Sequence, residues 1–384
     1  MRILQLVQQP ARRGAELFAA QLSSELERQS CEVRTVYLYS ADPCSALERR
    51  ASDVVLDRPR KSLQEKLGLD VGTLRALRVE LARFRPNIVQ LNGGRTVKYG
   101  SIMARVDGDS KRRFVYRNIG NLSDWVRGEV RRVAYSRLVF SGIDAAACLS
   151  ERNRQTLIGE FRFKGIARVI PSGITPDHLS VGLPRSALRA ELGTRPDDVV
   201  VIFVGSLTRE KRIDRLLRCY SAARRQAGNL QLWVVGEGPE RGAVEMAARE
   251  CPSIRILGTR RDMGDLYAAA DLAVLCSDTE GMPAVVLEAA YMGLPVVATH
   301  VGDLESCVVD GQSGFLVPPK SEGLLVAHIV KLAGDCESRR TLGEFGSNYV
   351  REKYLMRGLA QAYWELYEET LSRPAARQRV LGRP

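Results

Sequence analysis

Residues 270–298 read ADLAVLCSDTEGMPAVVLEAAYMGLPVVA, and this stretch decides the fold. Residues 272–276 form a short apolar run of the kind found in buried parallel strands. A polar loop follows over residues 277–282, and Pro283 opens a helix at a position where its missing N–H costs nothing. A turn then leads to a second apolar run. This order of strand, loop, helix, turn and strand predicts one unit of a parallel sheet covered by helices.

The same alternation of short apolar runs and longer helix-periodic stretches occurs along both halves of the chain. The strand candidates are residues 3–7, 33–38, 88–91, 114–116, 145–149 and 168–170 in the first half, and 199–204, 230–235, 254–257, 272–276, 295–298 and 315–317 in the second. After the first strand, a helix places Ala15, Phe18, Ala19, Leu22 and Leu26 on one face. The pattern predicts an α/β protein with two doubly wound parallel sheets.

A chain of 384 residues exceeds the size at which one hydrophobic core usually keeps growing, so we expect two domains. We predict a Rossmann-like domain over residues 1–175, a proline- and glycine-rich linker over 176–196 and a second Rossmann-like domain over 197–355. A last helix over residues 356–372 needs an apolar surface for its leucines and tyrosines, which the first domain can supply if the helix crosses back. Residues 373–384 form a basic tail.

The net charge of +12 points to anionic partners such as phosphates or lipid headgroups. Residues 105–168 alone hold 14 Lys and Arg against 7 Asp and Glu. This basic stretch is either a solvated surface or a face toward an anionic membrane. No secretory signal and no run long enough to span a membrane is visible, so we expect a cytoplasmic protein, or one peripheral at the inner face of the membrane.

The helix that opens at Pro283 carries the chemistry. Open N–H groups at its start, including those of Ala284 and Val285, form a ready site for a diphosphate. Glu280 stands just before the helix, where a carboxylate suits a sugar, and Glu288 lies eight residues further on, where it can accept both hydroxyls of a ribose. By themselves these acids could equally be a capping acid and an exposed helical acid.

These residues resemble the signature of glycosyltransferase family 4 (glycosyl transferases group 1), retaining enzymes in which two glutamates with seven residues between them flank the donor. The order and spacing of further motifs resemble the family too: VGSLTREKRIDRLL from Val204, VVGEGPER from Val234, GTRRDMGDLYAAADL from Gly258, and VVATHVGD with DGQSGFLVPP within residues 296–319. The resemblance implies the GT-B fold, in which two Rossmann-like domains face each other across a cleft.

The resemblance also implies site residues. Glu280 and Lys211 would be catalytic, with Glu280 facing the donor sugar and Lys211 neutralising the diphosphate leaving group. Glu288 would hold the ribose, and Thr259 with Arg260 would lie in the loop that reads the base. The donor-binding residues would be Gly205, Ser206, Arg209, Lys211, Gly258, Thr259, Arg260, Gly281, Met282, Pro283, Ala284 and Glu288. Because Ser206 stands where many members carry an arginine, Arg209 or Arg212 would have to supply that charge.

The first domain resembles the family more loosely. ARRGAE, ending at Glu16, sits like the family's loop between the first strand and helix, and would form an acceptor or phosphate loop from Arg13, Gly14, Ala15 and Glu16. YRNIG, from Tyr116, replaces a histidine-containing segment that often touches the sugar, which leaves Arg117 or Asn118 as substitutes.

We therefore predict a retaining glycosyltransferase that moves a sugar from a UDP- or GDP-sugar to a glycan or lipid-linked acceptor, as in bacterial cell-surface polysaccharide or lipopolysaccharide synthesis. We expect no cofactor and no metal, because no cluster of carboxylates could hold Mg²⁺, and His178, His300 and His328 are isolated.

The main alternative is a non-catalytic protein of the same fold that binds a nucleotide sugar. A dinucleotide enzyme using the GxGxxxG of Gly236, Gly238 and Gly242 is a weaker one, and no nucleic-acid partner is expected because no recognised module is present.

Overall fold

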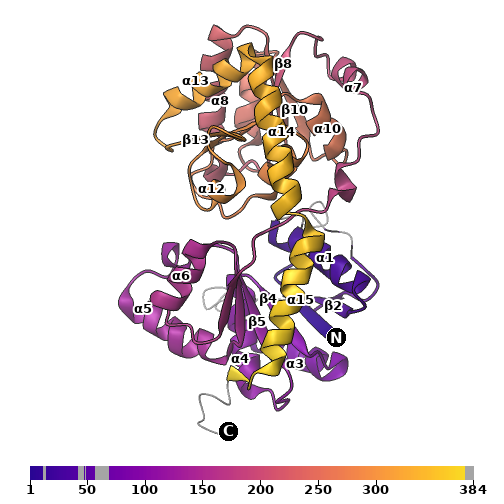
Figure 1. Cartoon of the computed structure of the whole chain (residues 1–384), viewed down its shortest axis with the longest axis vertical. Coiled ribbons are helices and arrows are strands. Elements are labelled where there is room, and N and C mark those ends of the chain that lie inside the picture. Colours follow the sequence, from indigo (N-terminus) through magenta and orange to yellow (C-terminus); the bar gives the residue numbers. More distant parts are fainter. Residues whose placement is uncertain (12–13, 42–46, 48, 57–68, 377–384) are drawn as a thin grey trace. The chain divides into compact units, whose positions relative to one another are not determined.

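The computed structural model describes residues 1–11, 14–41, 47, 49–56 and 69–376, which form two compact units (Figure 1). Unit 1 comprises Met1–Ser172 together with Met356–Pro384, and unit 2 comprises Gly173–Leu355. The final helix of the chain thus belongs to the same unit as the first strand. Each unit has its own sheet and its own core, and each is described below by itself.

The described part of unit 1 contains a sheet of seven parallel strands in the order β3-β2-β1-β4-β5-β6-β7. The strands are β1 (Arg2–Val7), β2 (Glu32–Tyr37), β3 (Val54–Val55), β4 (Ile88–Asn92), β5 (Arg113–Asn118), β6 (Ala145–Cys148) and β7 (Ile166–Val169). All six strands predicted for this half are confirmed within a few residues. The two-residue strand β3 was not predicted, because it is too short to show a pattern.

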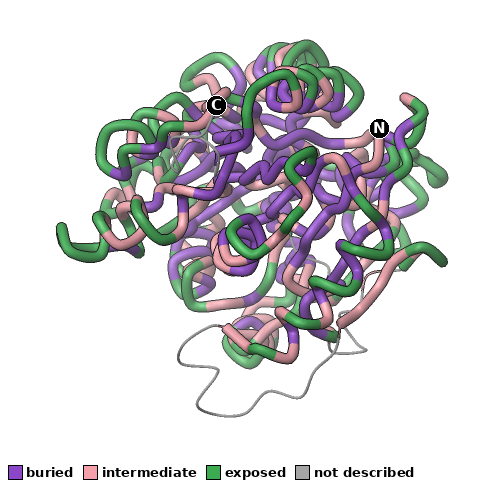
Figure 2. Tube along the Cα trace, turned by 90° about the horizontal axis from the view of Figure 1, so that it is seen from below, coloured by how far each residue is buried: buried purple, intermediate pink, exposed green. Residues whose placement is uncertain are grey.

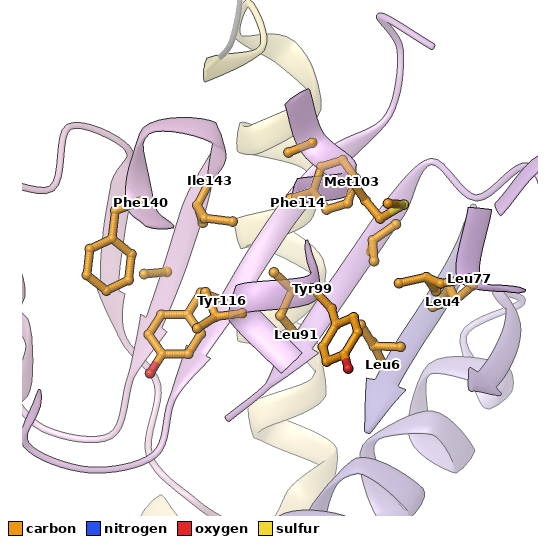
Figure 3. Packing of buried hydrophobic residues seen from close by; sticks show 14 of the residues in the cluster. Leu4, Leu6, Leu77, Leu91, Tyr99, Met103, Phe114, Tyr116, Phe140 and Ile143 are labelled. Carbon is orange, nitrogen blue, oxygen red and sulfur yellow. The ribbon is translucent and has the colours of Figure 1, made fainter. Parts of the chain in front are cut away.

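Helices cover both faces of this sheet. They are α1 (Gly14–Arg28), α3 (Val71–Phe84), α4 (Gly94–Val106), α5 (Glu129–Ala134), α6 (Glu151–Gly159) and α15 (Met356–Ser372), with the short turns η2 (Leu122–Asp124), η3 (Tyr135–Val139) and η4 (Phe140–Gly142). On one face, side chains of α3 and α4 pack against Leu6, Leu91 and Tyr116 of the strands, as Figure 3 shows with α15 behind the sheet. This aliphatic and aromatic cluster forms the larger core of unit 1.

Helix α15 covers the opposite face of the same sheet, beside α1. Its Leu359, Tyr363, Leu366 and Tyr367 are all buried, as the need for an apolar surface predicted. The ring of Tyr363 lies 5.9 Å from the ring of Phe18 in α1. The hydroxyl of Tyr367 donates to the side-chain oxygen of Gln90 in β4, which satisfies a buried polar group on the strand. The chain's last helix therefore completes the core of unit 1.

Unit 2 has a six-stranded parallel sheet in the order β10-β9-β8-β11-β12-β13. Its strands are β8 (Val199–Val204), β9 (Leu230–Val235), β10 (Ile254–Gly258), β11 (Leu272–Leu275), β12 (Val296–Thr299) and β13 (Gly314–Val317). Each lies where an apolar run predicted a strand. Strands β8, β9, β11 and β12 are almost entirely buried, which explains why their sequences are continuous apolar runs rather than alternating ones.

The helices of unit 2 begin before its first strand. They are η5 (Pro176–Leu179), α7 (Arg185–Glu191), η6 (Arg209–Lys211), α8 (Ile213–Gln226), α9 (Arg241–Glu250), α10 (Met263–Ala269), α11 (Ala284–Tyr291), α12 (Leu304–Cys307), α13 (Glu322–Gly334) and α14 (Cys336–Lys353). In the Cα tube of Figure 2, buried segments (purple) lie inside and exposed segments (green) lie mostly at the outside.

Residues 176–196, predicted as a linker, include η5 and α7, and both are fastened to unit 2. The carboxylate of Asp265 in α10 accepts from the backbone N–H groups of Gly182 at 2.6 Å and Leu183 at 2.9 Å. The guanidinium of Arg189 donates to the carbonyl oxygen of Ala269 at 2.9 Å. Proline and glycine content indicates irregular backbone, but it does not show whether that backbone is docked by polar contacts.

In both sheets the order of strands reverses beside the first strand of the unit. The reversal lies between β1 and β4 in unit 1 and between β8 and β11 in unit 2. Loops at the carboxyl ends of these strands run in opposite directions and leave a crevice where ligands of such sheets bind. The topology alone therefore directs attention to the loops that follow β8 and β11.

Candidate functional site

Three loops meet at the carboxyl edge of the unit 2 sheet, after β8, β11 and β12. The backbone N–H of Asp278 donates to the carbonyl oxygen of Glu210 at 2.9 Å, which joins the first two loops. The N–H of Asp303 donates to the carbonyl oxygen of Gly281 at 3.2 Å, which joins the second and third. A side chain at Gly302 would overlap the carbonyl oxygen of Glu280, so only glycine permits this close approach. The loop that carries Glu280 is thus held from both sides.

Lys211 and Glu280, which the sequence predicted as the catalytic pair, form an ion pair. The Nζ atom of Lys211 lies 2.5 Å from Oε1 of Glu280, which also accepts from the hydroxyl of Ser277 at 2.5 Å. Their side chains are only 17% and 8% exposed, so the pair is largely shielded from water. Lys211 ends the turn η6, and Arg212 continues in a left-handed conformation with φ of 53°. The turn therefore aims the lysine at the loop after β11.

Helix α11 begins directly after this loop. Pro283 is its N-cap rather than its first helical residue, a shift of one position from the prediction, and no side chain of the described residues caps the helix. Met282 is buried, while Gly281, Pro283 and Ala284 are partly exposed. The start of α11 therefore keeps backbone N–H groups available to an anion, with the Lys211–Glu280 pair immediately before it in the loop.

Glu288, the predicted ribose acid, lies inside α11 and is 13% exposed. One carboxylate oxygen faces Nε2 of His178 at 3.0 Å, and the other accepts from the hydroxyl of Tyr267 at 3.1 Å. Burial raises the pKa of Tyr267 well above its usual value, so this hydroxyl keeps its proton and donates it. The hydrogen bond to Glu288 raises the pKa of His178. The sequence presented His178 as an isolated histidine, and 110 residues separate it from its partner.

The loop after β9 supports the loop after β8. Gly236 has φ of 134°, and a Cβ there would overlap the carbonyl oxygen of Gly205. A Cβ on Gly238 would overlap the backbone of Leu207 in the same way. These two glycines let one loop lie directly on the other. Their GxG spacing is therefore explained by packing, without a dinucleotide.

Arg209 and Arg212 were the two candidates to replace the arginine missing at Ser206. The guanidinium of Arg212 is bound by the carboxylates of Asp214 at 2.9 Å and Asp278 at 3.0 Å. The side chain of Arg209 is exposed and makes no hydrogen bond or ion pair within the described part of the chain. Ser206 is exposed as well. Arg209 is therefore the arginine that remains available to a ligand.

The predicted base-reading residues lie at the end of β10, the edge strand of the sheet. Gly258 closes the strand, and its carbonyl oxygen accepts from the N–H of Gly236 at 2.8 Å. Thr259 is exposed, and the guanidinium of Arg260 is held by the carboxylate of Asp262. Across the described residues, no hydrogen bond or ion pair joins either side chain to Lys211 or Glu280, and their predicted role stays a prediction.

The site residues predicted in the first half all belong to unit 1. Arg13 lies outside the described residues. Gly14 and Ala15 begin α1, and Glu16 in its first turn is buried. Arg117 and Asn118 end β5 and are 2% and 1% exposed. Their predicted contacts with the acceptor or the sugar remain predictions.

Arg117 is enclosed by its own unit. Its guanidinium stacks on the ring of Phe18 with 3.5 Å from Cζ to the ring centre, and Nη2 donates to the hydroxyl of Ser172 at 2.8 Å. Nε and Nη1 are buried, and among the described residues neither makes a further hydrogen bond of normal geometry. Burial lowers the pKa of Arg117, while the nearby hydroxyl of Tyr363 and carboxylate of Glu16 act in the opposite direction.

Within the ranges that the structure describes, no three His, Cys, Asp or Glu side chains gather as they would around a metal ion. Among those same residues, no helix combines the length and the apolar character needed to cross a membrane. Burial raises the pKa of the thiols of Cys148, Cys276 and Cys307, which disfavours the thiolate that a cysteine nucleophile needs. The charged groups at α11 are thus the strongest candidates for chemistry.

Two family models match the chain. The model described as "Glycosyltransferase Family 4" matches residues 12–178, and the model described as "Glycosyl transferases group 1" matches residues 198–335. A D-inositol 3-phosphate glycosyltransferase from Corynebacterium jeikeium is 31% identical over 256 residues, which are 63% of this chain and 61% of that protein. Another, from Geodermatophilus obscurus, is 37% identical over 39% of this chain and 36% of its own length. The chain thus spans less than two thirds of the length of these relatives.

Solved structures show the same fold. Sucrose-phosphate synthase from Thermosynechococcus elongatus superposes with a TM-score of 0.79 at 22% identity, covering 97% of this chain and 100% of the other. Anabaena HepE in complex with UDP-glucose gives a TM-score of 0.78 at 21% identity, covering 97% and 99%. Together with the two doubly wound sheets, these similarities confirm the predicted GT-B fold class.

Proposed function

Because the chain belongs to the glycosyltransferases of family 4 and group 1, we propose that it transfers a sugar from a nucleoside-diphosphate sugar to a hydroxyl group of an acceptor. We further propose that the donor is a UDP- or GDP-sugar, that unit 2 binds it, and that the anomeric configuration is retained. Unit 1, with Gly14, Ala15, Glu16, Arg117 and Asn118, would serve the acceptor.

The observation that supports this proposal most strongly is the shielded Lys211–Glu280 pair beside the uncapped start of α11. The ammonium group of Lys211, 2.5 Å from the carboxylate of Glu280, can exchange this partner for another anion when one binds. A diphosphate at the start of α11 would accept hydrogen bonds from its N–H groups and draw Lys211 toward the phosphate oxygens. Glu280 would then be free to accept from hydroxyls of the donor sugar.

In the proposed reaction the bond between the anomeric carbon and the phosphate oxygen breaks while a bond to the acceptor oxygen forms on the same face. The acceptor's proton passes to the departing phosphate oxygen, so no protein base is required. Lys211, Arg209 and the N–H groups of α11 stabilise the negative charge that grows on the diphosphate. These groups would supply the positive charge that a metal ion supplies elsewhere, so we propose a metal-independent enzyme.

The names of relatives support the proposed classes of donor and acceptor. HepE was solved with UDP-glucose, and relatives are named D-inositol 3-phosphate glycosyltransferase and N-acetyl-alpha-D-glucosaminyl L-malate synthase. A structural neighbour, WaaG, is described as involved in lipopolysaccharide biosynthesis. These names support a nucleotide-sugar donor and a small, glycan or lipid-linked acceptor, and we propose a role in bacterial surface polysaccharide or lipopolysaccharide synthesis.

We also propose that unit 1 binds the inner face of an anionic membrane through α5 and η3. Neither element has a buried residue. Val130 is 84% exposed and Leu138 is 64% exposed, and Arg131 and Arg137 lie on the same two elements. Exposed apolar side chains interspersed with arginines are typical of segments that lie at a lipid surface. This patch would place a cytoplasmic enzyme beside a lipid-linked acceptor.

The experiment that tests the proposed function is a panel of UDP- and GDP-sugars scored by thermal stabilisation. A ligand present at 100 times its dissociation constant adds about 2.7 kcal/mol of stability. The stabilising donor is then incubated with candidate acceptors, with and without EDTA, and products are analysed for anomeric configuration. Donor binding without transfer to any acceptor would favour the alternative, a non-catalytic protein of the same fold. Failure of every nucleotide sugar to stabilise the protein would contradict both.

Sedimentation with vesicles of phosphatidylglycerol and phosphatidylcholine tests the membrane proposal. Val130→Glu or Leu138→Glu should weaken binding by about tenfold, because a charge replaces an apolar contact. Val79→Glu is the matched control, since Val79 is 64% exposed in the same unit but on α3. Equal binding by all variants would remove α5 and η3 from the membrane surface.

A further inference from the structure

The carboxylate of Glu288 is held on both of its oxygens by groups from two different segments. Oε1 faces Nε2 of His178 at 3.0 Å, and Oε2 accepts from the hydroxyl of Tyr267 at 3.1 Å. His178 lies in η5, before the first strand of unit 2, and Tyr267 lies in α10. The side chain of an acid inside a helix would otherwise be free to change rotamer.

The position of His178 is itself fixed by α10. A side chain at Gly264 would overlap the carbonyl oxygens of Leu179 and Ser180, so the backbone after His178 lies directly on that helix. Leu179 is buried, and Asp265 accepts from the N–H groups of Gly182 and Leu183. Helix α10 therefore fixes both donors to Glu288, one through its own Tyr267 and the other through the segment that it holds.

A carboxylate has two oxygens with about four acceptor positions in total. His178 and Tyr267 take one position on each oxygen, which leaves one further position on each. Two adjacent hydroxyls of a ribose need an acceptor with that arrangement. Because Glu288 is already held in this way, binding of the ribose loses little side-chain conformational entropy at this residue.

We propose that His178 is a positioning residue for donor recognition: with Tyr267 it fixes the carboxylate of Glu288 so that one acceptor position on each oxygen faces the two ribose hydroxyls. This inference rests on the proposed function, because it assumes that Glu288 binds a ribose. It assigns to η5, which lies before the first strand of unit 2, a part in discriminating ribonucleotides from deoxyribonucleotides.

The test compares UDP with 2′-deoxy-UDP, and GDP with 2′-deoxy-GDP, by isothermal titration calorimetry. We expect the unaltered protein to prefer the ribonucleotide by about tenfold, the size expected for a hydrogen bond to a charged group. In His178→Ala the preference should fall below about threefold, because Glu288 can turn away. His178→Gln, which keeps an N–H donor on a side chain of similar reach, should retain most of it. Tyr267→Phe should resemble His178→Ala.

His300→Ala is the matched control, because His300 pairs with Glu305 at the same distance of 3.0 Å without involving Glu288. It should leave the ribose preference unchanged. A merely structural role for His178 would lower the affinity for both nucleotides equally and keep their ratio, and that result would overturn the positioning role alone. Absence of binding of UDP and GDP to the unaltered protein would instead overturn the proposed function.

Discussion

Units 1 and 2 share the order of their first six strands, to which unit 1 adds β7, but differ at the carboxyl edges of their sheets. In unit 2 that edge carries the Lys211–Glu280 ion pair beside the exposed Arg209 and the partly exposed start of α11. In unit 1 the end of β5 carries Arg117, which is 2% exposed, stacked on Phe18 and hydrogen-bonded to Ser172. One edge holds charges that can exchange their partner for a ligand, whereas the other holds a charge enclosed by its own unit. The comparison teaches that a shared fold does not fix where a site is accessible.

The largest effect is expected at the accessible edge. Lys211→Ala should lower kcat by about 100-fold, by analogy with the loss of one oxyanion donor. Lys320→Ala, at an exposed lysine of the same unit, should leave kcat unchanged. Single-turnover rates with saturating donor measure this effect on the chemical step. A rate within about twofold of the unaltered enzyme would remove Lys211 from the mechanism.

Lys211→Ala also leaves Glu280 shielded and without its cation, which by itself destabilises a protein. The double variant Lys211→Met with Glu280→Gln removes both charges and separates the two effects. We expect it to melt near the temperature of the unaltered protein while remaining inactive. Recovery of activity along with stability would mean that the lysine acts only by pairing with Glu280.

A smaller effect is expected at the arginines beside Lys211. Arg209→Ala should weaken donor binding by about tenfold, because its unpaired guanidinium can form a charge-assisted hydrogen bond to the diphosphate. Arg212→Ala should change donor affinity less than about twofold, since Asp214 and Asp278 already bind that guanidinium. Titration of each variant with UDP and GDP measures the difference. The opposite ranking would mean that Arg212 leaves its carboxylates when the donor binds.

At the edge that carries Arg117 we expect a substitution to raise stability or leave it unchanged, whereas Lys211→Ala should lower it. Arg117→Met replaces a buried charge with an apolar side chain, so the free energy of unfolding should rise by about 1 kcal/mol or stay level. If Arg117 serves the acceptor, transfer should nevertheless fall. Chemical denaturation and the KM for acceptor give the two readings. A strongly destabilised variant would show that the charge is structural, and would weaken the contrast between the two units.

Much of this comparison could be predicted from the sequence, and the limits are physical. The central strands of parallel sheets are buried on both faces, so β8 and β9 are visible as continuous apolar runs and their bounds were predicted to the residue. The family motifs placed Lys211 and Glu280 around one donor, in loops at one edge of the sheet, but they did not predict the ion pair between them. In contrast, β3 has only two half-buried residues and no pattern to detect.

Contacts between distant polar residues could not be predicted. The docking of residues 176–196 depends on Arg189 and Asp265, which meet their partners about 80 residues away in the chain. The contact of His178 with Glu288 spans 110 residues and leaves no periodicity in the sequence. Nor could the sequence distinguish Arg209 from Arg212, since only the neighbouring carboxylates of Asp214 and Asp278 decide which guanidinium is available.

The smallest effect that we predict concerns the pH dependence of stability at His178. Its hydrogen bond with Glu288 raises its pKa, and Asp177 adds to the rise, so the folded protein holds this proton more tightly than the unfolded chain does. The resulting stabilisation is complete below 6.5, the ordinary pKa of histidine, and disappears as the pH rises through the higher pKa of the folded state. The melting temperature of His178→Gln should therefore fall below that of the unaltered protein most at about pH 6 and least at about pH 9. In a Glu288→Gln background the same substitution should give a difference that hardly changes with pH, because the carboxylate that raises the pKa is gone. A pH-dependent difference that persists there would mean that another group raises the pKa of His178. The contact of His178 with Glu288 would then position that carboxylate less tightly than the structure indicates.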